Sequence, residues 1–277
     1  MMYELTTDGE RLAYVLDRDL LSSVPWQRIA LPLMVTGRGE ELTGFFREIA
    51  TINLTCRIVR AGTSLLKETN ERGARIPADP TFEGDYRRFL REQLLIPPTL
   101  VERVLRMALR AVQASREEIN ETTRRRLTRQ AQRTHDYCYM CRQPLDFTGG
   151  DVNRKLELEH VWPQCYGGNS VDDNLLPACG SCNRKKAGFA TWAMVGVQSL
   201  ILGFEPSENE YTAVTGPQRF ALHYFTARRL LAHNPQMNLK QAFERLQPWR
   251  HEMRVRDASD IGDFFNIENH EPIPGVI

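Results

Sequence analysis

The chain has 277 residues, of which 42% are hydrophobic and 26% are charged, and its formal net charge is +1. This composition supports a buried core and excludes a disordered or fibrous chain. The near-neutral charge also argues against a protein that binds nucleic acid over its whole surface.

The first hundred residues contain two stretches in which apolar residues recur at helical spacing. The first covers residues 40–60 and the second covers 82–94, so both are predicted helices with a buried face. Breaks are predicted near Gly62, Gly73 and residues 77–80, where glycine and proline gather. This part of the chain carries no motif to which a chemical function can be attached.

A further helix is predicted after the prolines at 97–98, because Thr99 can cap the first free amides and Glu102 follows three residues later. A second start is predicted at Ser115, with Glu118 as its partner. The pattern therefore places the boundary between an N-terminal region and the centre near residue 115.

Arginines dominate the next segment and lead directly into the first cysteine pair. Residues 124–188 hold 11 Lys and Arg against 7 Asp and Glu, so the positive charge of the chain is concentrated there. Arg129 and Arg133 are candidates for contact with nucleic-acid phosphates, and the competing interpretation is a solvated helix face.

Two Cys-x-x-Cys pairs enclose residues 142–178, and their members are Cys138, Cys141, Cys179 and Cys182. Pairs with this spacing are typical of tetrahedral zinc sites. A zinc ion held by four thiolates has no open coordination position, so the predicted zinc is structural.

The remaining cysteines, Cys56 and Cys165, have no partner at metal-binding spacing. This usage fits a reducing compartment better than a disulfide framework. The N-terminus also lacks the residue order of a signal peptide. We therefore expect a cytoplasmic protein.

Between the cysteine pairs, residues 156–161 alternate as a half-buried strand does. Strand geometry sends Glu159 and His160 to opposite faces. Asn174 lies later in the same loop, and Asn183 follows the last cysteine. Because the zinc site is closed, these four side chains are the candidates for catalysis.

The order Cys-x-x-Cys, Leu-Glu-His-x-x-Pro-x-x-x-Gly-Gly, Asp-Asn-Leu-x-Pro-Ala-Cys-x-x-Cys-Asn-x-x-Lys resembles the HNH endonucleases, in the zinc-stapled branch of the ββα-metal nucleases. The resemblance covers residues 134–190. It implies a mainly α fold with a small α+β centre, in which a ββα-metal module held by structural zinc is flanked by helical regions.

The resemblance also implies a mechanism. Glu159 and Asn183 would hold one Mg²⁺, for which Mn²⁺ can substitute, because hard cations prefer oxygen ligands. His160 would act as general base on the attacking water, and Asn174 would brace the loop that orients it. Residues 184–186, namely Arg184, Lys185 and Lys186, would contact phosphates.

The substrate implied is DNA, most plausibly double-stranded, and the role implied is restriction or antiviral defence. Two alternatives stay open. The chain could be a nuclease subunit that a regulatory or targeting protein controls, or a zinc module that binds nucleic acid without catalysis. Loss of Glu159, His160 or Asn183 would favour the second alternative, and all three are present.

The C-terminal part has a long uncharged run at 189–204, which is too short for a membrane span and is predicted to be a buried helix. Helix starts are predicted at residues 216–217 and at Asn238, with Gln241 as its partner. The tail from residue 257 is acidic. The predicted organisation is an N-terminal region 1–115, a nuclease module 116–190 and a C-terminal region 191–277.

Overall fold

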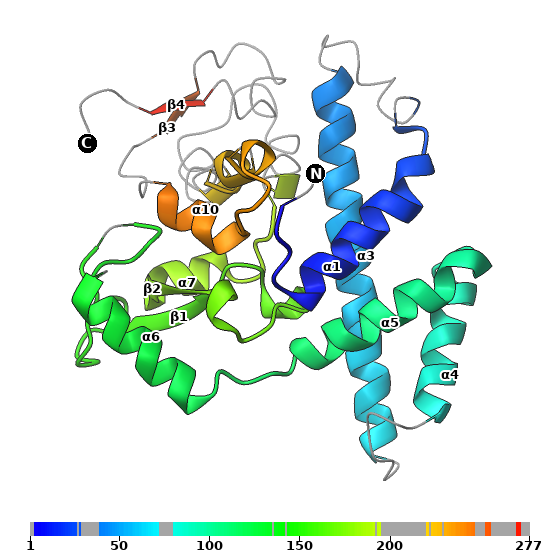
Figure 1. Ribbon diagram of the computed structural model, residues 1–277, viewed down its shortest axis with the longest axis horizontal. Helices are drawn as coiled ribbons and strands as arrows, with labels where there is room; N and C mark the ends of the chain where they lie inside the picture. Colours follow the sequence, from blue (N-terminus) through cyan, green and yellow to red (C-terminus); the bar gives the residue numbers. More distant parts are fainter. Residues whose placement is uncertain are drawn as a thin grey trace, which may run out of the picture.

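The structure is a computed structural model of the chain (Figure 1). It describes residues 3–26, 28, 39–71, 80–134, 136–141, 143–191, 193–194, 220–221, 223–228, 230–246, 253–255 and 270–272. Helices form most of the described part, and a small antiparallel sheet lies beside them. The predicted mainly α fold with a small α+β centre is therefore confirmed.

The N-terminal helices begin with α1 (Asp8–Val15), which a π-helical turn η1 (Leu16–Leu20) and a 3₁₀ turn η2 (Leu21–Ser23) extend. Thr7 starts α1 through a capping box: its side chain accepts from the Glu10 backbone N–H, and the Glu10 carboxylate accepts from Thr7 in return. This reciprocal pair satisfies two amides that would otherwise lack partners.

The long helix α3 (Gly39–Glu71) runs past Gly62 without interruption, so the break predicted there is wrong. A Cβ atom at Gly62 would lie 2.4 Å from the Val112 side chain and 2.8 Å from the Tyr86 ring. The glycine therefore allows close packing of helices, and it does not mark a turn. The other predicted breaks, at Gly73 and residues 77–79, lie outside the described residues.

Two more helical segments complete this part: α4 (Pro80–Arg88), which the π-helical turn η4 (Phe89–Gln93) extends, and α5 (Pro98–Ala114). The cap predicted at Thr99 is wrong, because α5 begins at Pro98 with Pro97 at the N-cap and no side-chain bond. Glu102 instead accepts a hydrogen bond from Arg87 Nε at 2.6 Å. Proline suits this position because it needs no hydrogen-bond acceptor for its nitrogen.

These helices bury one continuous apolar cluster, whose largest fully buried members are Leu12, Leu16, Ile58, Tyr86, Leu90, Ile96 and Leu105. The cluster contains no residue of the cysteine-bracketed loop.

Helix α6 (Glu121–Thr134) follows a short connection and lies against both strands of the small sheet (Figure 1). The prediction that this helix starts at Ser115 is wrong, because Ser115 ends α5. Asn120 caps α6 instead, and its Oδ1 accepts from the Thr123 backbone N–H at 2.8 Å. On the sheet side, Leu127 packs with Leu158 and with Leu175.

The sheet consists of β1 (Leu156–His160) and β2 (Leu175–Cys179), which pair antiparallel with His160 opposite Leu175 and Leu156 opposite Cys179. Two 3₁₀ turns, η5 (Gln164–Tyr166) and η6 (Asp172–Asn174), lie in the loop between them. Helix α7 (Gly180–Lys186) follows β2 directly. The order strand, strand, helix is the ββα module that the sequence predicts.

The C-terminal part contributes α10 (Leu239–Arg245) and a second strand pair, β3 (Met253–Val255) with β4 (His270–Pro272). The predicted cap at Asn238 is confirmed, since its side chain and that of Gln241 form a capping box. Most of 189–204, the predicted start at 216–217 and most of the acidic tail lie outside the described residues.

A second apolar cluster joins the cysteine-bracketed module to the C-terminal part. Tyr139, Val161 and Trp162 from the module share it with Tyr224 and Phe243. The division into regions 1–115, 116–190 and 191–277 stays a prediction. Within the described residues, no helix is both long enough and apolar enough to cross a membrane.

Candidate active site and metal centre

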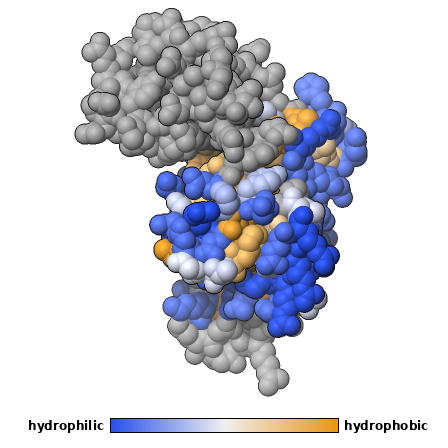
Figure 2. Space-filling view, turned by 90° about the vertical axis from the view of Figure 1, so that its left-hand side faces the viewer, coloured by the Kyte–Doolittle hydropathy of each residue, from blue (hydrophilic) through white to orange (hydrophobic). Residues whose placement is uncertain are grey.

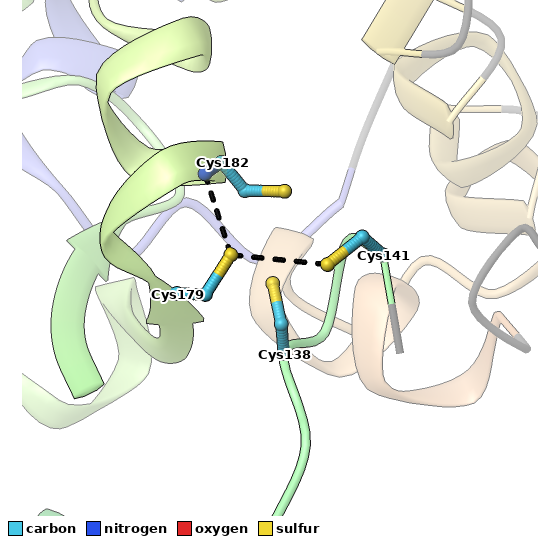
Figure 3. A group of neighbouring side chains, drawn as sticks. All are labelled: Cys138, Cys141, Cys179 and Cys182. Carbon is cyan, nitrogen blue, oxygen red and sulfur yellow. Dashed lines mark hydrogen bonds between the residues drawn. The ribbon is translucent and has the colours of Figure 1, made fainter. Parts of the chain in front are cut away.

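Four cysteines from two parts of the module converge on one point (Figure 3). Cys138 and Cys141 lie on the turn before β1, whereas Cys179 ends β2 and Cys182 lies in the first turn of α7. Their sulfur atoms all lie within 4.8 Å of one another, and Cys141 Sγ is 3.8 Å from Cys179 Sγ.

This geometry fits a zinc ion. Sulfur atoms bound to zinc at about 2.3 Å in a tetrahedron lie about 3.8 Å apart. The Cys182 backbone N–H also donates to Cys179 Sγ at 3.4 Å, a hydrogen bond of the kind that orients a metal-bound thiolate. The zinc would fix the end of β2 and the start of α7 against the turn before β1.

Glu159 lies on the β1 face that α7 covers, and only 3% of its surface is exposed. Tyr139 Oη donates to its Oε2 at 2.7 Å, and Lys186 forms an ion pair with its Oε1. Lys186 Nζ also donates to the His160 backbone oxygen at 2.9 Å. Burial raises the pKa of Glu159, while the lysine and the tyrosine oppose that shift.

The structure corrects the expectation for Lys186. The sequence placed it with two neighbours as a phosphate contact, but the residue is 2% exposed and its ammonium is bound inside the protein. Its neighbours Arg184 and Lys185 are exposed on α7. Arg184 donates to Asn153 Oδ1 at 2.8 Å.

Asn183, which the resemblance places with Glu159 around one metal ion, contacts the carboxylate of Glu157 instead. Its Nδ2 donates to Glu157 Oε2 at 2.6 Å, and Glu157 lies on the same face of β1 as Glu159. Both oxygens of Glu159 are already bound, and a positive charge lies beside them. In the observed arrangement, the Lys186 ammonium occupies the place beside Glu159 that a magnesium ion held by Glu159 and Asn183 would need.

His160 occupies the last position of β1, on the face opposite Glu159. Its Nε2 lies 2.9 Å from Ser170 Oγ, and the Ser170 hydroxyl donates to the Glu117 backbone oxygen at 2.7 Å. Burial lowers the pKa of His160 to about 4, and the charge of Lys186 adds to the shift. The imidazole is therefore neutral at pH 7 and has a free lone pair.

Asn174 holds the chain that leaves β1. Its Oδ1 accepts from the Trp162 backbone N–H at 2.7 Å, and its Nδ2 donates to the Trp162 and Asn169 backbone oxygens, each at 3.0 Å. The Val161 backbone N–H donates to the Asn174 backbone oxygen at 2.8 Å. Asn174 thus braces the segment that follows His160, and its part in orienting a catalytic histidine stays a prediction.

The exposed side of α6 carries a row of arginines. Arg125, Arg129 and Arg133 follow one another at four-residue spacing and line an open concave surface. Arg126 is ion-paired with Asp172 of the loop. Figure 2 looks onto this side of the molecule, where the described surface is mostly hydrophilic. Arg129 and Arg133 are therefore accessible to a large ligand.

Sequence reasoning missed Tyr139, Glu157, Ser170 and Glu117. Tyr139 lies between the first two cysteines, where its place near the site could have been noticed. Glu117 lies outside the cysteine-bracketed segment, and no sequence signal connects it with His160.

Comparison with protein families gives one match: residues 138–188 match the family model described as HNH endonuclease. No curated protein and no solved structure matches the chain. The match begins at Cys138 and ends two residues after Lys186, so it includes the cysteine centre, both strands of the sheet and α7.

Proposed function

We propose, from the HNH endonuclease domain that residues 138–188 form, that the protein is a nuclease that hydrolyses phosphodiester bonds in DNA. The observation that carries the proposal is the state of His160. Its imidazole is neutral, lies at the end of β1, and is fixed by a hydrogen bond between its Nε2 and Ser170 Oγ. A general base needs a free lone pair and a fixed orientation, and this side chain has both.

In the proposed reaction, His160 removes a proton from a water molecule as the water oxygen attacks the scissile phosphorus. The bond from phosphorus to the leaving oxygen then breaks, and the leaving oxygen takes up a proton from solvent water. Asn174 keeps the backbone after His160 in place during this step, and the desolvated surroundings keep the imidazole neutral beforehand. General-base catalysis of this kind typically contributes 10²- to 10⁴-fold in rate.

The proposal includes a catalytic divalent cation, Mg²⁺ or Mn²⁺, at Glu159 and Asn183. Lys186 would first have to leave the Glu159 carboxylate before the ion could bind there. Equilibrium binding of Mn²⁺ to the wild type and to Lys186→Met tests this part. Tighter binding by the variant supports competition between the ammonium and the metal, and equal binding contradicts it.

Exposed basic side chains are the proposed contacts to DNA. Arg129 and Arg133 on α6, with Arg184 and Lys185 on α7, present positive charge to a phosphate backbone. Double-stranded DNA is the proposed substrate, and cytoplasmic restriction or antiviral defence is the proposed role.

The second candidate is a nuclease subunit that a protein partner controls. The observation that favours it is the Tyr224 hydroxyl, which donates to the Val161 backbone oxygen, one residue after His160. A partner that moved the C-terminal part would thereby also act on the catalytic strand.

The decisive experiment incubates the purified chain with plasmid, linear duplex, single-stranded DNA and RNA, each with Mg²⁺ and with a chelator. Metal-dependent cleavage of DNA that is lost in His160→Ala, with zinc content and thermal stability unchanged, supports the enzyme. Cleavage retained in His160→Ala would remove the general-base assignment. Binding without cleavage would favour the non-catalytic or partner-controlled alternatives.

A further inference from the structure

Ser170 lies directly behind the imidazole of His160, and it is 4% exposed. Its Oγ has two neighbours: His160 Nε2 at 2.9 Å and the Glu117 backbone oxygen at 2.7 Å. The three groups form a short chain from the proposed general base to the connection between α5 and α6.

The hydrogens of this chain can be counted. A serine hydroxyl has one hydrogen, and a backbone carbonyl only accepts, so the Ser170 hydrogen points to the Glu117 oxygen. Ser170 Oγ must then accept from His160, whose Nε2 carries the proton. A neutral imidazole has a single N–H, so Nδ1 of His160 holds the lone pair.

Further contacts hold Ser170 and Glu117 together. The Glu117 backbone oxygen also accepts from Gln164 Nε2 at 2.6 Å, so both of its lone pairs are used. The Glu117 carboxylate accepts from the Ser170 backbone N–H at 3.2 Å and from Asn169 Nδ2 at 3.4 Å. These bonds leave the Ser170 hydroxyl little freedom to rotate.

The position of Glu117 depends on the N-terminal helices. Its backbone N–H donates to the Ala114 oxygen at 3.1 Å, in the turn that ends α5. Glu117 lies outside residues 138–188, so the family match does not include it. Glu117, a residue outside the HNH domain, is thus connected to the His160 imidazole by hydrogen bonds through Ser170.

We infer that Ser170 is a positioning residue that fixes the tautomer of His160: by donating its hydrogen to the Glu117 carbonyl, it keeps the imidazole proton on Nε2 and leaves Nδ1 free for the attacking water. The catalytic consequence rests on the proposed nuclease function. The tautomer itself does not, and it can be measured separately.

The test is long-range ¹H–¹⁵N NMR on the full chain with ¹⁵N-labelled histidine, in which His160→Ala identifies the His160 signals. The wild type should show a single Nε2–H tautomer. Ser170→Ala should show a mixture of both tautomers, and Ser170→Thr, which keeps the hydroxyl, should restore one. Glu117→Gln should leave the tautomer unchanged, because the backbone carbonyl remains.

Activity supplies the second measurement. The kcat of Ser170→Ala should fall by roughly twofold or more with KM unchanged, because about half or more of the molecules present a protonated nitrogen to the water. Ser22→Ala, an exposed hydroxyl at the far end of the N-terminal helices, controls for the loss of a serine.

An Nδ1–H or mixed tautomer in the wild type would overturn the inference, and so would an unchanged single tautomer in Ser170→Ala. The wild-type spectrum decides the assignment even if Ser170→Ala fails to fold. A wild type with the Nε2–H tautomer that cleaves no nucleic acid would contradict the proposed function and leave the tautomer assignment standing.

Discussion

Lys186 is the residue whose place in the molecule differs most from its appearance in the sequence. It follows two exposed basic residues, yet its ammonium lies inside, between the Glu159 carboxylate and the His160 backbone oxygen. Buried ion pairs contribute little net stability, but removal of one partner leaves an uncompensated buried charge.

Lys186→Met should therefore lower the free energy of unfolding by about 3 to 5 kcal/mol. Urea denaturation followed by circular dichroism measures the change. Lys185→Met removes the same charge from an exposed position on α7 and should change stability by less than about 0.5 kcal/mol. The double variant Glu159→Gln with Lys186→Met should recover part of the loss, and equal stability of all these variants would contradict the buried pair.

His223 provides a pH-dependent contribution to stability. It is fully buried against Phe243, with ring centroids 4.9 Å apart, and burial lowers its pKa to about 3. As the pH falls, His223 binds a proton near pH 6.5 in the unfolded chain, whereas in the folded chain it stays neutral until about pH 3. The stabilisation is therefore complete above pH 6.5 and is lost as the pH falls.

When the pH is lowered from 7 to 5, the protonation of this histidine in the unfolded chain should lower the free energy of unfolding by about 2 kcal/mol. Thermal or urea unfolding at both pH values measures the loss in the wild type. His223→Phe should lose less over the same interval, and the difference isolates His223 from His160, whose lowered pKa acts in the same direction. Parallel losses in both proteins would remove His223 as the cause.

At the scale of elements, the strand pair and α7 depend on the cysteine centre. The two strands have five residues each, and α7 has seven, so none of them is stable alone. Zinc binding supplies folding energy in such small modules.

Cys138→Ser should therefore lose zinc and lower the melting temperature, and a strong chelator should do the same to the wild type. Metal analysis and thermal unfolding measure both effects. Cys165→Ser is the matched control, because Cys165 is exposed and lies outside the cluster. A Cys138→Ser protein that is folded and free of zinc would contradict the structural role.

Helix α6 carries the prediction for DNA binding. Arg129→Ala with Arg133→Ala should weaken duplex binding at low salt and reduce the slope of log K against log salt by about 1.8, for two lost phosphate contacts. Fluorescence anisotropy over a sodium chloride series, in a His160→Ala background, measures the slope. Arg88→Ala with Arg91→Ala on the distant α4 segment removes equal charge and should leave the slope unchanged.

The elements also show what the sequence can and cannot predict. The cysteine spacing, the alternation in β1 and the cap at Asn238 are local signals, and the structure confirms the elements that they predict. The break predicted at Gly62 is wrong because the side chains that require a glycine there belong to neighbouring helices, which the local sequence does not contain.

The candidate site likewise contains residues that local sequence signals predict and residues that only the packing of elements brings together. His160 and Asn174 are candidates that the motif itself supplies, because the motif fixes their order and spacing, and their roles stay predictions. The partners of Glu159 and Asn183 could not be predicted, because Lys186 and Glu157 are chosen by how α7 lies across β1. Glu117 lies outside the motif in the sequence, and its contact with Ser170 depends on where α5 ends.

On the scale of the whole molecule, three distant parts of the chain meet around the module. Asn169 Oδ1 accepts from the Asp8 backbone N–H at 2.8 Å, and Thr191 Oγ1 donates to Glu48 Oε2 at 3.0 Å. Lys240 Nζ donates to the Asp172 backbone oxygen at 2.8 Å. The N-terminal helices and the C-terminal part both touch the loop that carries the site.

The core shared by Tyr139, Val161, Tyr224 and Phe243 sets the order of events during synthesis. Residues 189–246 must leave the ribosome after the HNH segment before this core can close, which takes about 3 to 12 s at 5–20 residues per second. A nascent chain that ends at residue 188 should therefore remain sensitive to protease, whereas one that extends well past 246 should resist it. The strand that carries His160 is thus finished only after residues 189–246 have been made.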